Sequence, residues 1–212
     1  MSYRLKKKES LAKGLRRIGY EQLDRAIERI QHSESADHRG EAIHGARKGL
    51  KQLRALLRLV QERLPGEFYK RENRVFRDAA RRLSAQRDAD VQMRTMDRLQ
   101  KQISAKARGP LLVPIKRALR KDVRKVYANA QNSGSPGQAM DSLKKARRRL
   151  KKWPLGKLEW RDAWTGLKRT YKQGLRRFQA VQQRTGFEDL HEWRRHVKDL
   201  WYHLRLLNAA SP

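Results

Sequence analysis

Residues 44–58 read HGARKGLKQLRALLR, and their polar and apolar positions recur with the spacing of an amphipathic α-helix. At about 100° per residue, the cationic side chains fall within an arc of roughly 120° around His44, and the apolar side chains lie opposite. The segment contains no Asp or Glu, so ion pairs within the helix do not account for its charges. Because like charges one turn apart destabilise a helix, the basic face indicates an anionic ligand.

A second copy of this pattern lies 147 residues further along the chain, and we expect its apolar side, with Val197, Leu200 and Leu204, to pack into a core as in the first copy. The preceding helix is repeated as well, since residues 14–17 read GLRR and residues 166–169 read GLKR. We expect a duplicated helical hairpin whose copies face each other across a pseudo-two-fold axis. The predicted anion-binding residues are His44, Arg47, Lys48, Lys51, Arg54 and Arg58 in the first copy, and His191, Arg194, Arg195, Lys198 and Arg205 in the second.

The composition is strongly basic. The 212 residues include 53 Lys and Arg against 22 Asp and Glu, which gives a formal net charge of +31. A bound polyanion would neutralise this field and stabilise the fold by mass action. The absence of Cys excludes disulfides, thiolate metal sites and cysteine nucleophiles. No apolar run exceeds three residues, so we expect no membrane span and a cytoplasmic location.

Gly, Pro and Ser clusters divide the chain into helix-sized pieces, and no segment alternates with the period of a strand. The sequence predicts an all-α fold of antiparallel hairpins in a single domain over residues 1–212. Gly109 and Pro110 separate the two expected four-helix halves, at about 9–108 and 110–208. The expected helices are about 9–31, 38–63, 67–83, 87–106, 111–131, 136–151, 158–183 and 187–208.

The basic helix face spans roughly 21 Å from residue 44 to residue 58, which suits a linear polyanion. Arg outnumbers Lys by 33 to 20, and the planar guanidinium pairs bidentately with phosphate oxygens. A phosphate chain or a nucleic-acid backbone therefore fits better than a carboxylate metabolite. We expect His44 and His191 to contact phosphate rather than only to pack. Packing is the interpretation for the remaining histidines, which are His32, His38, His196 and His203.

Two acidic residues, Asp88 and Asp90, raise the question of a metal site. Acids near a helix start more often interact with the helix dipole or with arginine, so we expect no metal and no cofactor. The chain also lacks a phosphate-binding glycine loop, an HExxH motif and a nucleophile elbow. These absences favour a binding protein over an enzyme.

Three motifs carry a likeness to a known family, and the likeness extends over nearly the whole chain, from about residue 9 to 208. They are His44-x-x-Arg47-Lys48-x-x-Lys51-x-x-Arg54, Arg87-Asp88-Ala89-Asp90-Val91 and Leu190-His191-x-x-Arg194-Arg195-x-x-Lys198. In these features the chain resembles the CHAD family, the conserved histidine α-helical domain. The resemblance implies two four-helix bundles related by pseudo-symmetry and the binding of inorganic polyphosphate along a basic central cleft. Some family members are found on polyphosphate granules, and some are joined to a triphosphate-tunnel catalytic domain.

The chain departs from the family pattern in several places. Trp201 stands where the second motif would repeat Arg54, and Gly45 and Gly49 reduce the helix propensity of the first motif. The Glu-x-Glu-x-Lys start of a tunnel domain is absent. The resemblance therefore implies non-catalytic polyphosphate binding. Sequence-independent binding of an RNA or DNA backbone is the alternative, because the same phosphate contacts serve both.

Overall fold

The computed structural model describes residues 3–33, 39–103, 112–183 and 186–208, and within these ranges every regular element is helical. The prediction of an all-α fold is confirmed, and each of the eight expected helices is present. Their bounds are α1 (Leu11–His32), α2 (Arg39–Leu59), α3 (Gly66–Arg82), α4 (Ser84–Gln102), α6 (Val113–Asn132), α7 (Ser135–Leu150), α8 (Trp160–Gln183) and α9 (Phe187–Leu207). Helix α2 ends before the predicted residue 63, because a 3-10 turn, η1 (Gln61–Arg63), replaces its last turn.

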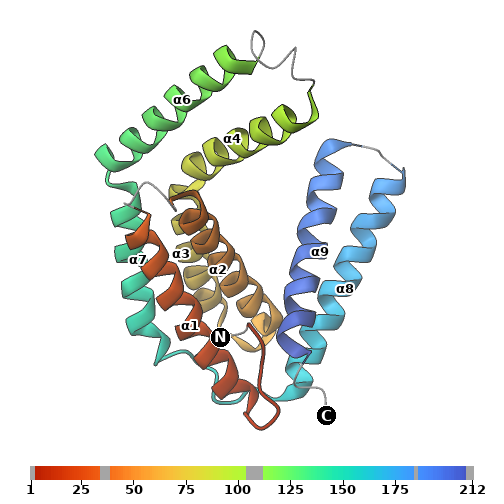
Figure 1. Ribbon diagram of the computed structural model, residues 1–212. Coiled ribbons are helices and arrows are strands. Elements are labelled where there is room, and N and C mark those ends of the chain that lie inside the picture. The colour runs from red at the N-terminus through yellow and green to blue at the C-terminus, as the bar shows by residue number, and fades with distance from the viewer. Residues whose placement is uncertain (1–2, 34–38, 104–111, 184–185, 209–212) are drawn as a thin grey trace.

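Helices α1, α2, α3 and α7 form a four-helix bundle in which each packs against two of the others (Figure 1). The apolar face predicted for α2 lies inside this bundle, where Ala46, Leu50, Leu53 and Leu57 are fully buried. Phe76 of α3 is also fully buried in the same core. Burial of this face fixes the direction in which the cationic face of α2 points, because the two faces lie on opposite sides of one helix.

The packing joins helices from both halves of the chain. Helix α7 lies against α1 and α3, and α6 pairs with α4 in an arm that extends from the bundle (Figure 1). The expected boundary at Gly109 and Pro110 lies outside the described residues. Two bundles related by a pseudo-two-fold axis therefore stay a prediction.

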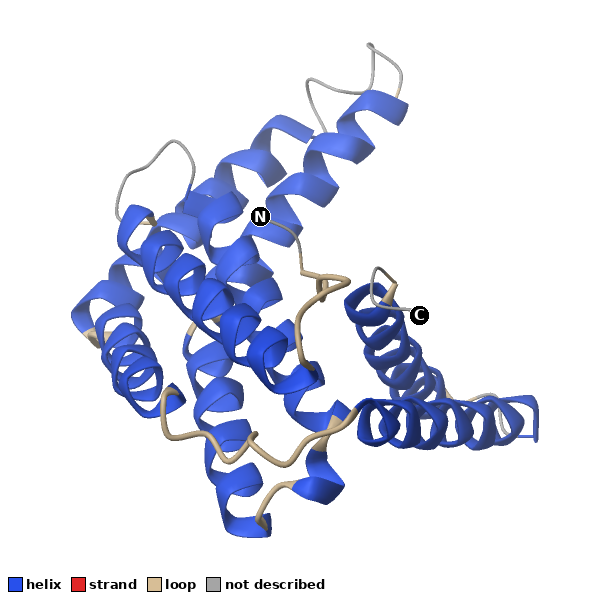
Figure 2. Ribbon diagram, turned by 90° about the horizontal axis from the view of Figure 1, so that it is seen from below, coloured by secondary structure: helices blue, strands red, loops and turns tan. Residues whose placement is uncertain are grey.

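Helices α8 and α9 pair as a hairpin that projects from the bundle (Figures 1 and 2). Among the helices of the bundle, α2 makes the main contact with this hairpin, and both α8 and α9 pack against it. The approach of α8 is very close at Gly166, where an added Cβ would lie 1.7 Å from the backbone oxygen of Leu59. This contact between backbones holds α9 beside α2, and so brings the two predicted motif copies next to each other.

One sequence expectation is wrong for α9. The apolar side of this helix was expected to pack into a core, as it does in α2, yet Val197 and Leu204 are 43% and 51% exposed. The physical reason is that, among the described residues, no helix covers the side of the hairpin that faces away from α2. Leu206 and Leu207, at the end of the helix, are buried instead.

Candidate anion-binding site

A pocket between α2 and α9 brings the two motif copies together. It has a volume of about 200 Å³. Seven of the eleven predicted residues line it, and Asp199 and Tyr202 complete the wall. The seven are Lys51, Arg54 and Arg58 from α2, and His191, Arg194, Arg195 and Lys198 from α9. We refer to it as the α2/α9 pocket.

The cations of the α2/α9 pocket are crowded and partly desolvated. Burial lowers the pKa of Lys51, and the positive charge of Lys198 lowers it further. Burial and then the neighbouring Arg58 lower the pKa of Arg54 to about 10. The Arg54 Nε donates to the amide oxygen of Asn73 at 2.9 Å, a neutral partner that orients the guanidinium without neutralising it. A bound anion would relieve both the burial cost and the repulsion.

Asp199 supplies a carboxylate to this pocket, where it forms an ion pair with Arg58 Nη1. The pocket thus holds six cationic side chains against one carboxylate among its described lining residues. Arg195 also forms an ion pair with Glu192 at 2.9 Å, so the excess is four positive charges. Sequence reasoning missed Asp199. The sequence did contain a signal for this residue, because Asp199 is the one acidic residue between Arg194 and Arg205.

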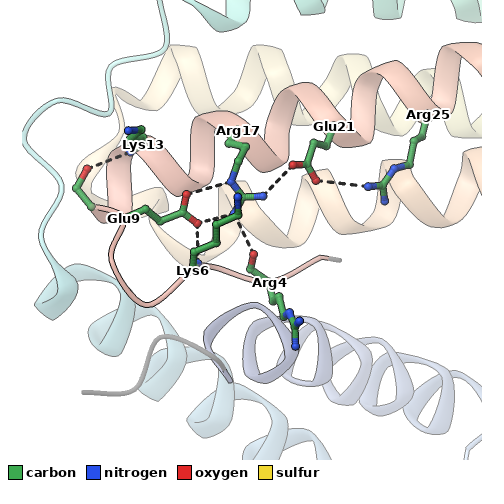
Figure 3. Close-up of polar contacts among 8 residues, drawn as sticks. Arg4, Lys6, Glu9, Lys13, Arg17, Glu21 and Arg25 are labelled. Atoms are coloured by element: carbon green, nitrogen blue, oxygen red, sulfur yellow. Dashed lines mark hydrogen bonds and ion pairs between the residues drawn. The ribbon is translucent and has the colours of Figure 1, made fainter. Parts of the chain in front are cut away.

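Arg17 of helix α1 is an example of a cation with a structural role, because carboxylates neutralise its charge. Arg17 Nε donates to Glu9 Oε2 at 3.0 Å, and Arg17 Nη1 donates to Glu21 Oε1 at 2.9 Å (Figure 3). The hydrogen bond to Glu9 raises the pKa of Arg17. The pKa shifts of Lys51 and Arg54 have the opposite direction, which distinguishes these two pocket cations from Arg17.

A second pocket, of about 500 Å³, lies on the other side of α2, toward α1. Three further predicted residues, His44, Lys48 and Arg205, line it. Burial and the charge of Arg87 lower the pKa of His44, so its ring is neutral at pH 7 and one ring nitrogen carries a proton to donate. We refer to this as the α1/α2 pocket.

Two cations of the α1/α2 pocket, Arg25 and Arg29, come from α1 and were missed by the sequence analysis. Arg25 Nη2 lies 3.4 Å from Glu21 Oε2 (Figure 3). Arg29 lies against Gly45, where an added Cβ would meet its guanidinium at 2.7 Å. The glycine that seemed only to weaken the motif helix thus makes room for a cation beside His44. The four-residue spacing of Arg25 and Arg29 on one helix face was the available signal.

Arg47 lines neither pocket, although the sequence placed it on the same basic face. Its Nη1 donates to the backbone oxygen of Ala80, near the end of α3. Carbonyl groups in the last turn of a helix lack partners within the helix, so this bond satisfies one and attaches α3 to α2. Burial lowers the pKa of Arg47. The structure therefore gives Arg47 a packing contact, and its part in anion binding stays a prediction.

The acidic motif on α4 has a structural contact in the fold. The Tyr127 hydroxyl, on α6, donates to Asp90 Oδ2 at 2.9 Å, and burial raises the pKa of this carboxyl. Asp90 also lies against the start of α2, since a Cβ at Gly40 would meet its carboxylate at 2.9 Å. The described residues contain no group of three or more His, Asp or Glu that could hold a metal ion.

Burial of His203 confirms its predicted packing role. Its Nε2 lies 2.8 Å from the backbone oxygen of Ala55, which fastens α9 to α2 below the pocket. Burial lowers its pKa to about 4. His196 is half-buried in α9, whereas His38 lies outside the described residues.

The family model described as CHAD domain matches residues 21–212, which is nearly the whole chain and includes both motif copies. No curated protein sequence matches the chain. Of the helices that the structure describes, none has the length and apolar character to cross a membrane.

Proposed function

Because the chain belongs to the CHAD domain family, we propose that it binds inorganic polyphosphate in the α2/α9 pocket and catalyses no reaction on it. The observation that carries the proposal is the meeting of the two motif copies. Residues 147 positions apart in the sequence line one pocket, which has a formal excess of four positive charges once the ion pairs of Arg58 and Arg195 are counted. Side chains with desolvated, mutually repelling charges are costly unless an anion binds among them.

The shape of the pocket supports a narrow ligand. Its volume of about 200 Å³ is below the roughly 300–1,000 Å³ of common small-molecule sites. Proteins that bind single-stranded nucleic acid usually offer exposed aromatic rings on which bases stack. The aromatic residue that lines this pocket, Tyr202, is buried. An unbranched phosphate chain needs only cations, and arginine pairs with its oxygens in a bidentate geometry.

The α1/α2 pocket extends the binding surface in this proposal. Lys48 and Lys51 lie within one turn of α2, and they line the two different pockets. A long polyphosphate chain would therefore cross α2 from one pocket to the other. A protein that binds in this way would gather on polyphosphate granules, and a fluorescent fusion would show this in cells that store polyphosphate.

The salt dependence of polyphosphate affinity tests directly whether the positive charges of the pocket drive binding. Four neutralised charges imply a slope of log affinity against log salt of about −2.8, taking roughly −0.7 for each contact as for single-stranded nucleic acids. Raising NaCl from 50 to 200 mM should then weaken binding of long-chain polyphosphate about 50-fold. Isothermal titration calorimetry at several salt concentrations measures the slope. A slope near zero would contradict the proposal.

A charge-reversal variant locates the site. Lys51→Glu with Lys198→Glu changes two exposed side chains of the α2/α9 pocket, one from each motif copy. The matched control is Lys145→Glu with Arg148→Glu, which makes the same change of charge at two exposed positions of α7. We expect the pocket variant to lose at least ten times more affinity than the control. Equal losses would show that polyphosphate binds diffusely to the basic surface.

Two further measurements separate this proposal from its competitors. Polyphosphate should displace a fluorescent single-stranded RNA from the protein at lower phosphate concentration than unlabelled RNA does. The opposite order would make RNA the preferred ligand. Incubation of the purified protein with polyphosphate and magnesium should release no phosphate, and release by the wild type but not by the pocket variant would make the protein an enzyme.

A further inference from the structure

The α8/α9 hairpin carries two stripes of exposed apolar side chains. Within each helix they lie at positions i, i+7, i+11 and i+14, the spacing of a coiled-coil seam. All eight are between 37% and 56% exposed. The stripes consist of Trp164, Tyr171, Leu175 and Phe178 on α8, and Leu190, Val197, Trp201 and Leu204 on α9.

Both stripes lie on one side of the hairpin. Each occupies an arc of roughly 60° on its helical wheel, about a quarter turn from the line of contact between the two helices. Gly174 and His196 mark that line, since a Cβ added at Gly174 would lie 3.8 Å from the Cβ of His196. Because the helices are antiparallel, the same sense of rotation turns both stripes to the same side. The opposite side of the hairpin packs on α2, for example at Gly166 (Figures 1 and 2). We refer to the uncovered side as the apolar hairpin face.

The duplicated hairpin shows what this face is built to contact. The alignment of the two motif copies places Ile43, Leu50 and Leu57 of α2 at the positions of Leu190, Val197 and Leu204, and all three are fully buried. In the first hairpin, α3 packs on α2 and α7 packs on α1 over this face. The contact of Leu150 in α7 with Gly19, where Tyr171 stands in the second copy, belongs to this packing. Two helices thus cover the first copy of the face, whereas the second copy is bare in the described structure.

The apolar hairpin face has the size of a protein interface. Eight large apolar side chains, each about half exposed, leave roughly 700 Å² uncovered, because such side chains present about 150–250 Å² when free. The largest apolar patch on a typical monomer is about 300–600 Å². A standard stable interface buries about 800 Å² on each partner, which the face and its polar rim together supply.

We propose that a second copy of this chain covers the apolar hairpin face. The α8/α9 hairpins of two copies pack face to face, so that their four helices complete a bundle like that of α1, α2, α3 and α7. The occupant has the required form, because the partner hairpin is itself a pair of antiparallel helices with matching seams. A two-fold axis makes this interface self-complementary, which is the commonest arrangement in homo-oligomers.

The charges around the face predict an unusual salt dependence for this dimer. Lys168 and Lys172 flank the stripe on α8, and Arg194 and Arg205 flank the stripe on α9. These cations repel their counterparts in the second copy at low ionic strength. The Debye length falls from about 10 Å at 0.1 M salt to about 3 Å at 1 M, so salt should strengthen the dimer. Salt has the opposite effect on polyphosphate binding, and the two proposals can therefore fail independently.

Sedimentation velocity with polyanion-free protein in 0.5 M NaCl tests the proposal. We expect a species of twice the 25.0 kDa chain mass, and more dimer at 0.5 M than at 0.05 M NaCl. Tyr171→Glu with Val197→Glu, which replaces one exposed residue of each stripe, should give the monomer mass. Val113→Glu with Ile115→Glu is the matched control, because it makes the same kind of change at exposed apolar positions of α6 and should leave the dimer intact.

Circular dichroism verifies that both variants keep the helical content of the wild type. A wild-type monomer in 0.5 M NaCl would overturn the second copy as the occupant and assign the face to another helical partner. A dimer that persists in the stripe variant, or that is lost equally in the control, would place the interface elsewhere on the molecule.

Discussion

Gly166→Ala should separate α8 from α2, because the added methyl group has no room. The Cβ would lie 1.7 Å from the backbone oxygen of Leu59 and 2.7 Å from its carbonyl carbon. Ordinary van der Waals contact requires about 3.5 Å, so α8 must retreat by about 1.8 Å. A gap of only about 0.5–1 Å already forfeits a quarter to a half of each dispersion contact. The retreat therefore loosens the whole contact between the hairpin and α2.

The size of the effect follows from two opposing contributions. Overpacking a tight site costs about 1–3 kcal/mol, and a contact between two backbones belongs at the upper end of that range. Replacing a helical glycine by alanine recovers about 1 kcal/mol. The free energy of unfolding should fall by about 2 kcal/mol, and Tm by about 4–8 °C for a chain of this length.

Gly174→Ala on the same helix is the matched control. Its Cβ would lie 3.8 Å from the Cβ of His196, an ordinary contact, so only the gain in helix propensity remains. Thermal unfolding followed by circular dichroism at 222 nm should show Tm raised in this variant and lowered in Gly166→Ala. If alanine raised Tm equally at both positions, the close approach of α8 to α2 would be refuted.

Three other properties should respond to single changes. Glu72→Ala should lower the free energy of unfolding by about 3–5 kcal/mol in urea titrations, because the fully buried carboxylate accepts from Arg149 Nε at 2.9 Å. His203, whose pKa is lowered to about 4 by burial, binds a proton in the unfolded chain from pH 6.5 downward. The free energy of unfolding should therefore fall between pH 6.5 and 4, by at most about 1.4 kcal/mol per pH unit from this group, and His203→Leu should remove that part of the slope. Burial and neighbouring cations lower the pKa of His44, so this residue should take up a proton when polyphosphate binds. The affinity for polyphosphate should therefore rise from pH 7 to pH 5.5, and His44→Gln should reduce this rise.

The helix pattern could be predicted from the sequence because local signals specify it. The glycine, proline and serine clusters mark the ends of the helices, and the period of the apolar residues marks their buried faces. The burial of Leu50 and Leu53 follows from that period alone. The same reasoning placed Lys51 and Lys198 on basic faces of separate helices, and the repeat indicated that these faces should meet.

The remaining features depend on packing between distant segments, which a helical wheel does not contain. The wheel gives Arg47 and Lys51 the same face, yet Arg47 bonds to Ala80 at the end of α3 while Lys51 lines the pocket. A wheel likewise assigns Leu57 and Leu204 to equivalent apolar faces. Only the first is buried, because burial depends on whether another helix lies across the face.

The two copies of the repeat have diverged in how they balance stability against binding. Helix α2 is held on its apolar side by two helices of the bundle, α1 and α3, so its backbone is fixed and its cations can be desolvated without unfolding the helix. Helix α9 is held by α8 and by the N-terminal segment, where the Leu5 amide donates to the Leu206 oxygen at 2.9 Å, and it has a smaller contact with α2 that includes His203 to Ala55. Repulsion between Lys51 and Lys198 acts across that weaker contact and tends to open the pocket. An anion bound between the two helices reverses the sign of this interaction. If polyphosphate binds as we propose, it therefore also supplies a counter-charge that holds the hairpin against the bundle.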